Sequence, residues 1–551
     1  MTTLTARPAP VGTGSVPERG AFAGTGRLVR FALRRDRIRL TAWLLGVTAL
    51  SVSTAVSFAG LYVTAEDRQG TAATMDSPAG LAMTGPRLYL TDYNLGSMMG
   101  HQMLGFTAVL VALMSIFLVV RHTRAEEESG RAELLRATVV GHHAHLAAAL
   151  IVALIANLLL ALLITVTHGA LGVDGMTWSG SVLYGVAHAA VGMTFAGVAA
   201  VTAQVMEHPR GASGAASAVL GAAYVLRAVG DASNQTLSWS SPIGWAQATY
   251  VYVDDRWWPL LLCVAATVLL AGLGFALSTR RDLGAGLRAP RPGRASATPA
   301  LRRPLGFALR LQRSVLIGFL VALALTGISY GSFLADVEEM LANVEGLDEA
   351  VAAMGGATIT ESFISMVTIV MSIFASIFVV LAVLRARGEE NAGRAEPVLA
   401  TKLSRTRWLG SHLLVAVGGG ALLSLTGALG LAVAGVATTG DGSLFATGLG
   451  AAVAYLPAQW VTAGVTVALY GWVPRLATLA WFVPGYAFLV GYLGEILQMP
   501  DWLQRFSPFS VVPTVPAEAM AWIPLVGLTL VAGVLVGLGL LGLRRRSMGA
   551  A

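Results

Sequence analysis

The sequence has almost no cysteine and few charged residues. Cys263 is the only cysteine in 551 residues, so the chain cannot form an internal disulfide. Charged residues make up 12% of the sequence and hydrophobic residues 55%, a composition that excludes an ordinary soluble globular protein. The composition indicates a polytopic integral membrane protein.

Lysine is also nearly absent. Lys402 is the single lysine, and it stands in the sequence Ala-Thr-Lys-Leu. A P-loop requires lysine within Gly-Lys-Ser/Thr, because its ammonium group reaches the β- and γ-phosphates of the bound nucleotide. The chain therefore has no P-loop. If ATP hydrolysis drives this protein, a different polypeptide has to supply the ATPase.

Long apolar windows dominate what is present. A membrane-spanning helix needs about 20 mostly apolar residues, and the sequence predicts an all-α integral membrane protein with twelve transmembrane helices. The twelve windows lie near residues 38–62, 98–120, 144–171, 179–205, 211–230, 257–279, 314–335, 362–384, 410–437, 444–472, 476–494 and 522–543.

These windows contain no aspartate and no glutamate. An ion-coupled secondary exporter normally keeps a carboxylate inside the membrane to take up and release protons, so this class is only the alternative function. His188 and Arg227 are polar residues within windows and are candidate residues of a transport pathway. Their plainer interpretation is a hydrogen bond from His188 to a neighbouring helix and an ion pair between Arg227 and Asp231.

Three histidines, His142, His143 and His145, cluster at the start of the third window. A metal site or an enzyme active site would need converging acids, thiols or nucleophiles, and the cluster contains none of them. We expect interfacial histidines here, with no metal site and no catalytic residues.

The arginines are distributed unevenly about the predicted membrane. Every basic residue except Lys402 is an arginine, and nearly all of them fall on one side. By the positive-inside rule that side is cytoplasmic, which places both termini in the cytoplasm. Contact with anionic membrane lipids explains the net charge of +7, so no nucleic-acid partner is expected. The arginines that do not fall on the predicted cytoplasmic side are Arg68, Arg87, Arg227, Arg256 and Arg505.

Composition also predicts the division of the chain. Residues 27–40 place six arginines around one face of an amphipathic helix, which we expect to lie in the membrane interface before the first span. The sequence Gly-Phe-Ala-Leu-Arg at 306–310 partly repeats it. The predicted parts are a disordered cytoplasmic tail (1–26), a first six-span half (27–279), a flexible cytoplasmic linker (280–304) and a second six-span half (305–551).

One polar segment occurs twice. Residues 124–133 read R-A-E-E-E-S-G-R-A-E, and residues 387–396 read R-G-E-E-N-A-G-R-A-E, at an offset of 263 residues. Extended to Thr138 and Thr401, nine of fifteen positions are identical (Arg, Glu, Glu, Gly, Arg, Ala, Glu, Ala and Thr). Each copy follows the second apolar window of its half, so the chain contains an internal duplication.

The charges of this repeated segment favour a helix stabilised by ion pairs. Glu127 precedes Arg131 by four residues, and Glu390 precedes Arg394 likewise, which is the favourable orientation for a helical pair. The glycines at 130 and 393 do not fit a helix interior, because glycine costs about 0.5 to 1 kcal/mol there relative to alanine. They indicate a close backbone approach or a turn between two short helices, and the segment as a whole suggests docking to another protein.

An amphipathic entry helix, six spans in each half and E-E-x-x-G-R-A-E after the second span of each half resemble the permeases of type 2 ABC exporters. The likeness is strongest to the fused, double-length permeases of actinobacteria described as antibiotic or multidrug exporters. It implies two tandem six-helix ABC-2-type halves in a bacterial plasma membrane, exporting hydrophobic or amphipathic compounds. It also implies two copies of a partner ATPase subunit, which would bind ATP and magnesium, while this chain would bind no cofactor.

In that family the loop after the second span holds a coupling helix that docks on the ATPase. The resemblance implies docking residues at the matching positions of both copies. The copies differ at two places: Glu128 is replaced by Asn391, and Leu134 by Pro397. Because proline removes a backbone donor, we expect the second docking helix to end near Glu396 and the first loop to couple more strongly. The implied docking residues are Glu126, Glu127, Gly130, Arg131 and Glu133, and Glu389, Glu390, Gly393, Arg394 and Glu396.

Overall fold

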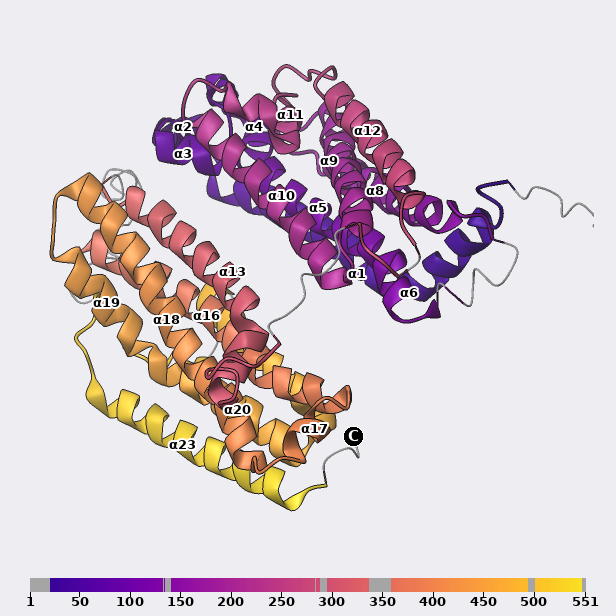
Figure 1. The fold of residues 1–551 in the computed structure, drawn as a ribbon. Coiled ribbons are helices and arrows are strands. Elements are labelled where there is room, and N and C mark those ends of the chain that lie inside the picture. Colours follow the sequence, from indigo (N-terminus) through magenta and orange to yellow (C-terminus); the bar gives the residue numbers. More distant parts are fainter. Residues whose placement is uncertain are drawn as a thin grey trace, which may run out of the picture. The chain divides into compact units, whose positions relative to one another are not determined.

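The computed structural model describes residues 20–131, 133, 140–282, 284–287, 295–335, 358–493 and 501–547. Across those ranges the regular secondary structure is helical, with no β-strand (Figure 1). Eleven helical segments within the described ranges are long and apolar enough to cross a membrane. The prediction of an all-α membrane protein is therefore confirmed.

The predicted span at 476–494 is the one that differs. Its place is taken by the 3₁₀ helix η4 (Pro474–Trp481) and by α21 (Phe482–Leu493). As described, α21 is 12 residues long, which is shorter than the about 20 residues that a full crossing requires. Twelve complete crossings are therefore not confirmed.

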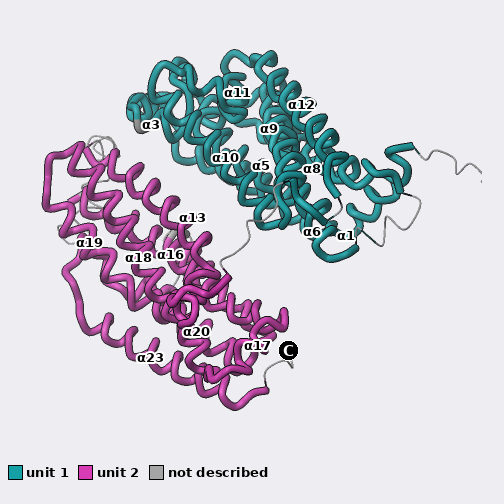
Figure 2. The backbone as a smooth tube through the Cα atoms, in the orientation of Figure 1, with its two compact units in different colours: residues 1–292 teal, residues 293–551 magenta. Residues whose placement is uncertain are grey.

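The chain forms two compact units, residues 1–292 and 293–551 (Figure 2). The long helices of the first unit are α1 (Thr25–Leu61), α5 (Leu104–His122), α8 (Ala144–Ala170), α9 (Trp178–Val205), α10 (Pro209–Asp231) and α12 (Leu260–Ser278). Those of the second are α13 (Pro304–Ser332), α16 (Ile359–Asn391), α18 (Arg405–Thr439) and α23 (Trp522–Arg545), together with α19 (Leu444–Ala454) and α20 (Leu456–Trp472), which form one candidate span.

Shorter helices connect these segments in the first unit. Between α1 and α5 lie α2 (Ala65–Met75), α3 (Pro78–Met83), η1 (Arg87–Thr91), α4 (Leu95–Met98) and the π-helix η2 (Met99–Met103). Between α10 and α12 lie η3 (Leu237–Ser240) and α11 (Pro242–Gln247). The described part of the second unit also contains α17 (Ala395–Leu399) and α22 (Asp501–Gln504).

Helix α9 lies at the centre of the first unit, where α5, α8 and α12 pack around it. It is the most buried of the candidate spans, whereas α12 and α13 are the least buried. In the second unit α13 packs along α18, and the carbonyl oxygen of Gly427 occupies the place that a Cβ on Gly327 would need. Small residues of this kind let helices approach closely in a membrane, where the hydrophobic effect contributes little to helix association.

The entry helix differs from the prediction. Residues 27–40 do not form a separate interfacial helix, because α1 runs without a break over 37 residues. At 1.5 Å per residue such a helix is about 55 Å long, well beyond the roughly 30 Å hydrocarbon core. One end of α1 must therefore lie outside the hydrocarbon, and the Arg-rich beginning is the polar end.

The predicted tail and linker are partly ordered. Residues 1–19 of the tail lie outside the described residues, but the carbonyls of Ala21 and Ala23 accept hydrogen bonds from the backbone N–H groups of His143 and Gly141. In the linker, the N–H of Leu287 donates to the carbonyl of Gln204. The first residues of the linker therefore contact the first unit, and the flexibility of the linker stays a prediction.

Candidate functional site

The repeated segment leaves the second long helix of each unit in two different ways. In the first unit α5 ends at His122, and the backbone breaks at Thr123 (φ −120°, ψ −87°) before the short helix α6 (Arg124–Glu128). In the second unit α16 continues through the same motif without a break to Asn391. The two copies have the same backbone conformation again at the glycine that follows.

Gly130 and Gly393 both adopt left-handed backbone conformations, with φ of 72° and 68°. Apart from its chain neighbours, no described atom lies within 4 Å of where a Cβ would stand on either residue. The close backbone approach that the sequence allowed is therefore not found at either glycine. Left-handed glycine directly after a helix is a common way to end it, since glycine has no Cβ to clash. The interpretation as a turn is confirmed at both glycines, but in the second copy the turn joins the long α16 to the short helix α17 (Ala395–Leu399).

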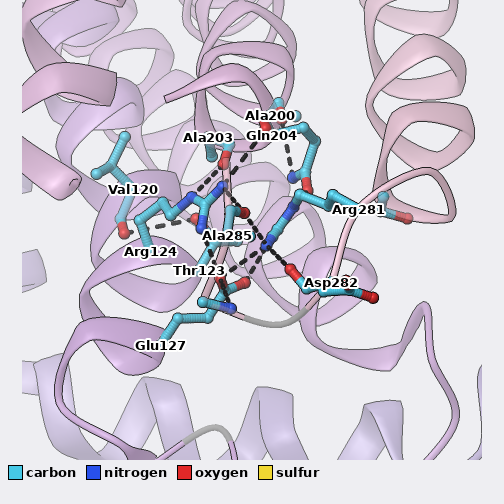
Figure 3. Close-up of polar contacts among 12 residues, drawn as sticks. Val120, Thr123, Arg124, Glu127, Ala200, Ala203, Gln204, Arg281, Asp282 and Ala285 are labelled. Atoms are coloured by element: carbon cyan, nitrogen blue, oxygen red, sulfur yellow. Dashed lines mark hydrogen bonds and ion pairs between the residues drawn. The ribbon is translucent and has the colours of Figure 1, made fainter. Parts of the chain in front are cut away.

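The second glutamate of the first copy, Glu127, is held by two arginines (Figure 3). Arg281, three residues after α12, donates to both carboxylate oxygens at 2.6 and 2.8 Å. Arg124 donates to Oε2 at 2.8 Å, and the backbone N–H of Gly284 lies 3.3 Å from the same oxygen. The Glu127 carboxylate therefore joins α6 to the segment that follows α12.

The same arginines bind the end of α9. Arg124 is completely buried, and its guanidinium donates to the backbone carbonyls of Ala203 and Ala285 (Figure 3). Nε of Arg281 donates to Oε1 of Gln204 at 2.6 Å. Cations at a helix C-terminus are stabilised by its free carbonyls and by the helix dipole.

The second copy has a corresponding arrangement around Glu390. Arg546, the first residue after α23, donates to both carboxylate oxygens at 2.7 Å. The hydroxyl of Tyr470, near the end of α20, donates to Oε2, and the Arg546 guanidinium stands 4.9 Å from the centre of the Tyr470 ring. Burial alone would lower the pKa of Arg546, but the hydrogen bonds to Glu390 raise it above its ordinary value.

The first glutamate of each copy pairs with the arginine five residues on. Glu126 lies 3.9 Å from Arg131 and 2.6 Å from Arg35 of α1. Glu389 lies 2.8 Å from Arg394 and 2.7 Å from Arg385. The hydrogen bond to Glu389 raises the pKa of Arg394, which keeps its charge.

The predicted pairs Glu127–Arg131 and Glu390–Arg394 are therefore wrong. Helical i,i+4 geometry requires an unbroken helix between the two residues. The glycine turn ends the helix before the arginine in both copies, and the second glutamate faces an arginine that follows the last long helix instead.

The entry helices contact this region through residues that the sequence had not indicated. Asp36 of α1 is buried and pairs with Arg121 at 2.9 Å and with His122 at 2.8 Å. The shared sequence Phe-Ala-Leu-Arg, at 31–34 and 307–310, aligns Asp36 with Gln312. Gln312 is also buried, and its amide nitrogen lies 3.1 Å from Nδ1 of His412. The first unit uses an ion pair where the second uses a neutral hydrogen bond.

Comparison with known proteins agrees with this duplicated architecture. The family described as "Multidrug efflux system permease Rv1217c, C-terminal domain" matches residues 27–277 and 301–544, one stretch in each half. The chain belongs to this family. The multidrug efflux system permease protein Rv1217c of Mycobacterium tuberculosis (strain ATCC 25618 / H37Rv) is 39% identical over 547 residues, which cover 97% of each chain.

The two copies of the repeated segment, residues 124–133 and 387–396, are called the first and second loops of the permease below. They expose only some of the predicted docking residues. Glu126, Glu389 and Glu390 are buried, and Glu127 is largely buried in its ion pairs. The side chains of Arg131 and Arg394 are 63% and 55% exposed. Glu133 and Glu396 are exposed as well. Within the described residues, the exposed charges that both loops share are thus an arginine and the glutamate two residues later, and the first loop also exposes Glu128.

Of the two differences between the copies, the first lies at the surface, and the second does not act as predicted. The carboxylate of Glu128 is exposed and lies 3.7 Å from the His208 ring. The second helix does not end near Glu396, because α17 begins at Ala395 and carries Pro397 in its first turn. Backbone N–H groups in a first turn have no intrahelical acceptor, so proline costs nothing there. Leu134 lies outside the described residues.

The two candidate pathway residues have partners inside the first unit. His188 is buried; its Nδ1 donates to the carbonyl of Tyr184, and Nε2 lies 2.6 Å from the Thr107 hydroxyl of α5. Arg227 is buried at 3.5 Å from Asp231, with its guanidinium 4.6 Å from the Tyr224 ring centre. The predicted helix-to-helix bond and the predicted ion pair are both confirmed, and each explains its residue structurally.

The histidines at the start of α8 do not form a metal-binding group. Nδ1 of His143 lies 3.2 Å from the Ser278 hydroxyl, and its ring packs against Phe22 and Phe275. In the part of the chain that the structure describes, no three His, Cys, Asp or Glu residues are placed to hold a metal ion.

Arg281, Arg546, Asp36 and Gln312 are the functional candidates that sequence reasoning missed. A signal for the first two exists in the sequence, because Arg280–Arg281 and Arg544–Arg546 follow the last apolar window of each half. In the sequence, these arginines indicate only the orientation in the membrane. Nothing in a single sequence indicates which of several adjacent arginines turns inward.

Proposed function

We propose that the permease is the translocation subunit of an ATP-driven exporter of hydrophobic or amphipathic compounds, such as drugs or antibiotics. The observation that carries the proposal is the pair of repeated loops, each bound by buried ion pairs to the helices of its own unit. The relative from Mycobacterium tuberculosis is named as a multidrug efflux permease, which supports the cargo class.

In this proposal a separate subunit hydrolyses ATP and docks on the exposed part of each loop. Arg131 and Glu133 in the first loop, and Arg394 and Glu396 in the second, offer one charge of each sign to a partner surface. Complementary charges set the register of a protein interface more than its affinity. The buried glutamates then pass a displacement of the loop to the helices.

One chain would recruit two ATPase subunits, because it contains two loops. The test is the native mass of the complex purified from its own membrane through an N-terminal tag, with hydrolysis of magnesium-ATP measured alongside. We expect two ATPase copies per chain, and no hydrolysis by the permease alone. One ATPase per chain, or a permease dimer, would contradict the fused arrangement.

Export itself is tested by ethidium accumulation in cells that express the complex. Depletion of ATP should stop efflux even while a proton gradient is maintained. Efflux that survives ATP depletion and collapses with a protonophore would favour the alternative, an ion-coupled secondary exporter.

We further propose that the loops and both termini are cytoplasmic. Within its own unit, each of the pairs Glu127–Arg281 and Glu390–Arg546 joins the loop to the arginine-rich end of the last span, and the positive-inside rule assigns such ends to the cytoplasm. In a Cys263→Ala background, a cysteine at the exposed Asn234 should react with an impermeant thiol reagent in intact cells, and one at Ala297 should not. Labelling at Ala297 would overturn this orientation.

A further inference from the structure

The same carboxylate–arginine contact occurs in both units. In each, the second glutamate of the repeated motif receives two hydrogen bonds from an arginine that follows the last long helix of that unit. A residue near the end of the fourth span completes the contact: Gln204 in the first unit and Tyr470 in the second. We call these two groups the Glu127 clasp (Glu127, Arg281, Gln204) and the Glu390 clasp (Glu390, Arg546, Tyr470).

The two clasps share the doubly hydrogen-bonded carboxylate–arginine pair, but the third residue is attached differently. Gln204 accepts a hydrogen bond from Arg281, whereas Tyr470 donates one to Glu390. Gln204 and Tyr470 differ chemically, and the arginine stands three residues after α12 but one residue after α23. Unrelated surface pairs would not meet at the same carboxylate twice. The recurrence indicates that the contact itself, rather than any one supporting residue, has been retained.

Both clasps are well shielded from water. The side chains of Arg281 and Glu127 are 7% and 10% exposed, and those of Arg546 and Glu390 are 15% and 4% exposed. Arginine and carboxylate joined by two parallel hydrogen bonds form a strong and directional pair. Removing one partner of such a pair leaves a charge in a poorly solvated place, so the loop would lose its fixed position.

We propose that Arg281 and Arg546 are positioning residues for energy coupling, which fix each loop to the ends of the fourth and last spans. This inference rests on the proposed function, since it assumes that an ATPase moves the loops. With the Glu127 clasp closed, a displaced first loop moves the end of α9 and the segment that follows α12. With the Glu390 clasp closed, a displaced second loop moves the ends of α20 and α23. With the clasp open, the loop moves and the spans do not follow.

The matched variants are Arg281→Gln and Arg546→Gln, singly and together, with Arg280→Gln and Arg545→Gln as controls. The control arginines are exposed and adjacent in sequence. Each complex is purified through an N-terminal tag, ATP hydrolysis is measured, and ethidium accumulation is followed in cells at equal expression. The double clasp variant should retain ATPase binding and hydrolysis while ethidium export falls at least about fivefold, the lower end of typical coupling between sites.

Arg281→Lys provides the rescue arm. Lysine restores the charge but not the two parallel hydrogen bonds, so export should recover only in part. A role limited to stability would instead lower the amount and hydrolysis of every clasp variant together with export. That pattern would overturn the proposal.

A reversible cross-link separates positioning from folding. In the Cys263→Ala background, Glu127→Cys combined with Arg281→Cys replaces the ion pair by a covalent bridge made with a cleavable bifunctional thiosulfonate. The bridged permease should export ethidium, and cleavage should reduce export to the level of Arg281→Gln. Export that is unchanged by cleavage, or wild-type export by both Gln variants, would refute the clasp. If the unmodified complex shows no ATP-dependent export, the proposed function fails instead.

Discussion

The two repeated loops share one clasp but differ in how much of their unit they hold. The first loop contacts the entry helix through Glu126 and Arg35, and it contacts α9 through Arg124. The second loop satisfies Glu389 with Arg385 and Arg394, which belong to the same stretch of chain. Both loops reach the end of the fourth span, the second through Glu390 and Tyr470, so the contact with the entry helix is what distinguishes the first loop.

This difference shows which contacts persisted through duplication. The carboxylate–arginine contact with the last span is present in both units, whereas among the described residues an ionic contact between the loop and the entry helix is found only in the first. Asp36 pairs with Arg121 and His122, while its counterpart Gln312 makes a neutral hydrogen bond to His412. Displacement of the first loop should therefore move an entry helix that the second loop leaves in place.

The largest expected contrast is between the two entry helices. Asp36→Ala leaves Arg121 and the buried His122 without their carboxylate, and breaking a buried ion pair typically costs about 3 to 5 kcal/mol. Because Arg121 is one-third exposed, we expect the lower end, about 3 kcal/mol. Gln312→Ala loses a neutral hydrogen bond and should cost about 1 kcal/mol. The measurement is the free energy of unfolding in mixed micelles titrated with SDS.

Asp36→Asn serves as the matched control for shape. The amide retains hydrogen-bonding capacity without charge. Residue 36 would then carry a neutral amide, as residue 312 does in the second entry helix. Its cost should lie between those of the two alanine variants. Equal costs for Asp36→Ala and Gln312→Ala would mean that the ionic contact adds nothing, and the contrast between the units would be lost.

The next contrast concerns the exposed arginines of the loops. Arg131 lies 3.9 Å from Glu126, so its charge is largely available to a partner, whereas Arg394 donates twice to Glu389. Arg131→Glu should therefore reduce substrate-stimulated ATP hydrolysis of the complex more than Arg394→Glu, by about tenfold, or roughly 1.4 kcal/mol of docking energy. Gln variants at both positions separate loss of charge from reversal. Equal losses would indicate symmetric docking.

The smallest effects are expected where the two copies agree. Gly130→Ala and Gly393→Ala place a Cβ on left-handed backbone, which costs about 1 kcal/mol at each site, and the empty space around both glycines adds no clash. Gly388, inside α16 at the position that Ala125 occupies in the first copy, is the control. Gly388→Ala should stabilise the protein by about 0.5 to 1 kcal/mol. Thermal unfolding in detergent measures all three, and a clearly larger loss at one glycine would break the symmetry of the turns.

The sequence alone predicted the membrane helices, the duplication and the glycine turns. These are local properties: apolar length identifies a span, and glycine in a polar segment marks left-handed backbone. Similarly, Arg227 and Asp231 lie one helical turn apart, so their ion pair follows from spacing alone. The comparison of residues 124–133 with 387–396 required no structure at all.

Which charges meet was decided by tertiary structure. Glu127 could pair with Arg131 by spacing, yet it binds Arg281, which is 154 residues away. Pro397 appeared to end a helix, but the local fold placed it in a first turn where its missing donor is not needed. Spacing specifies partners only within one continuous helix. Once the chain turns, the partner of a buried charge is whichever opposite charge the packing of distant segments brings into the same unhydrated space.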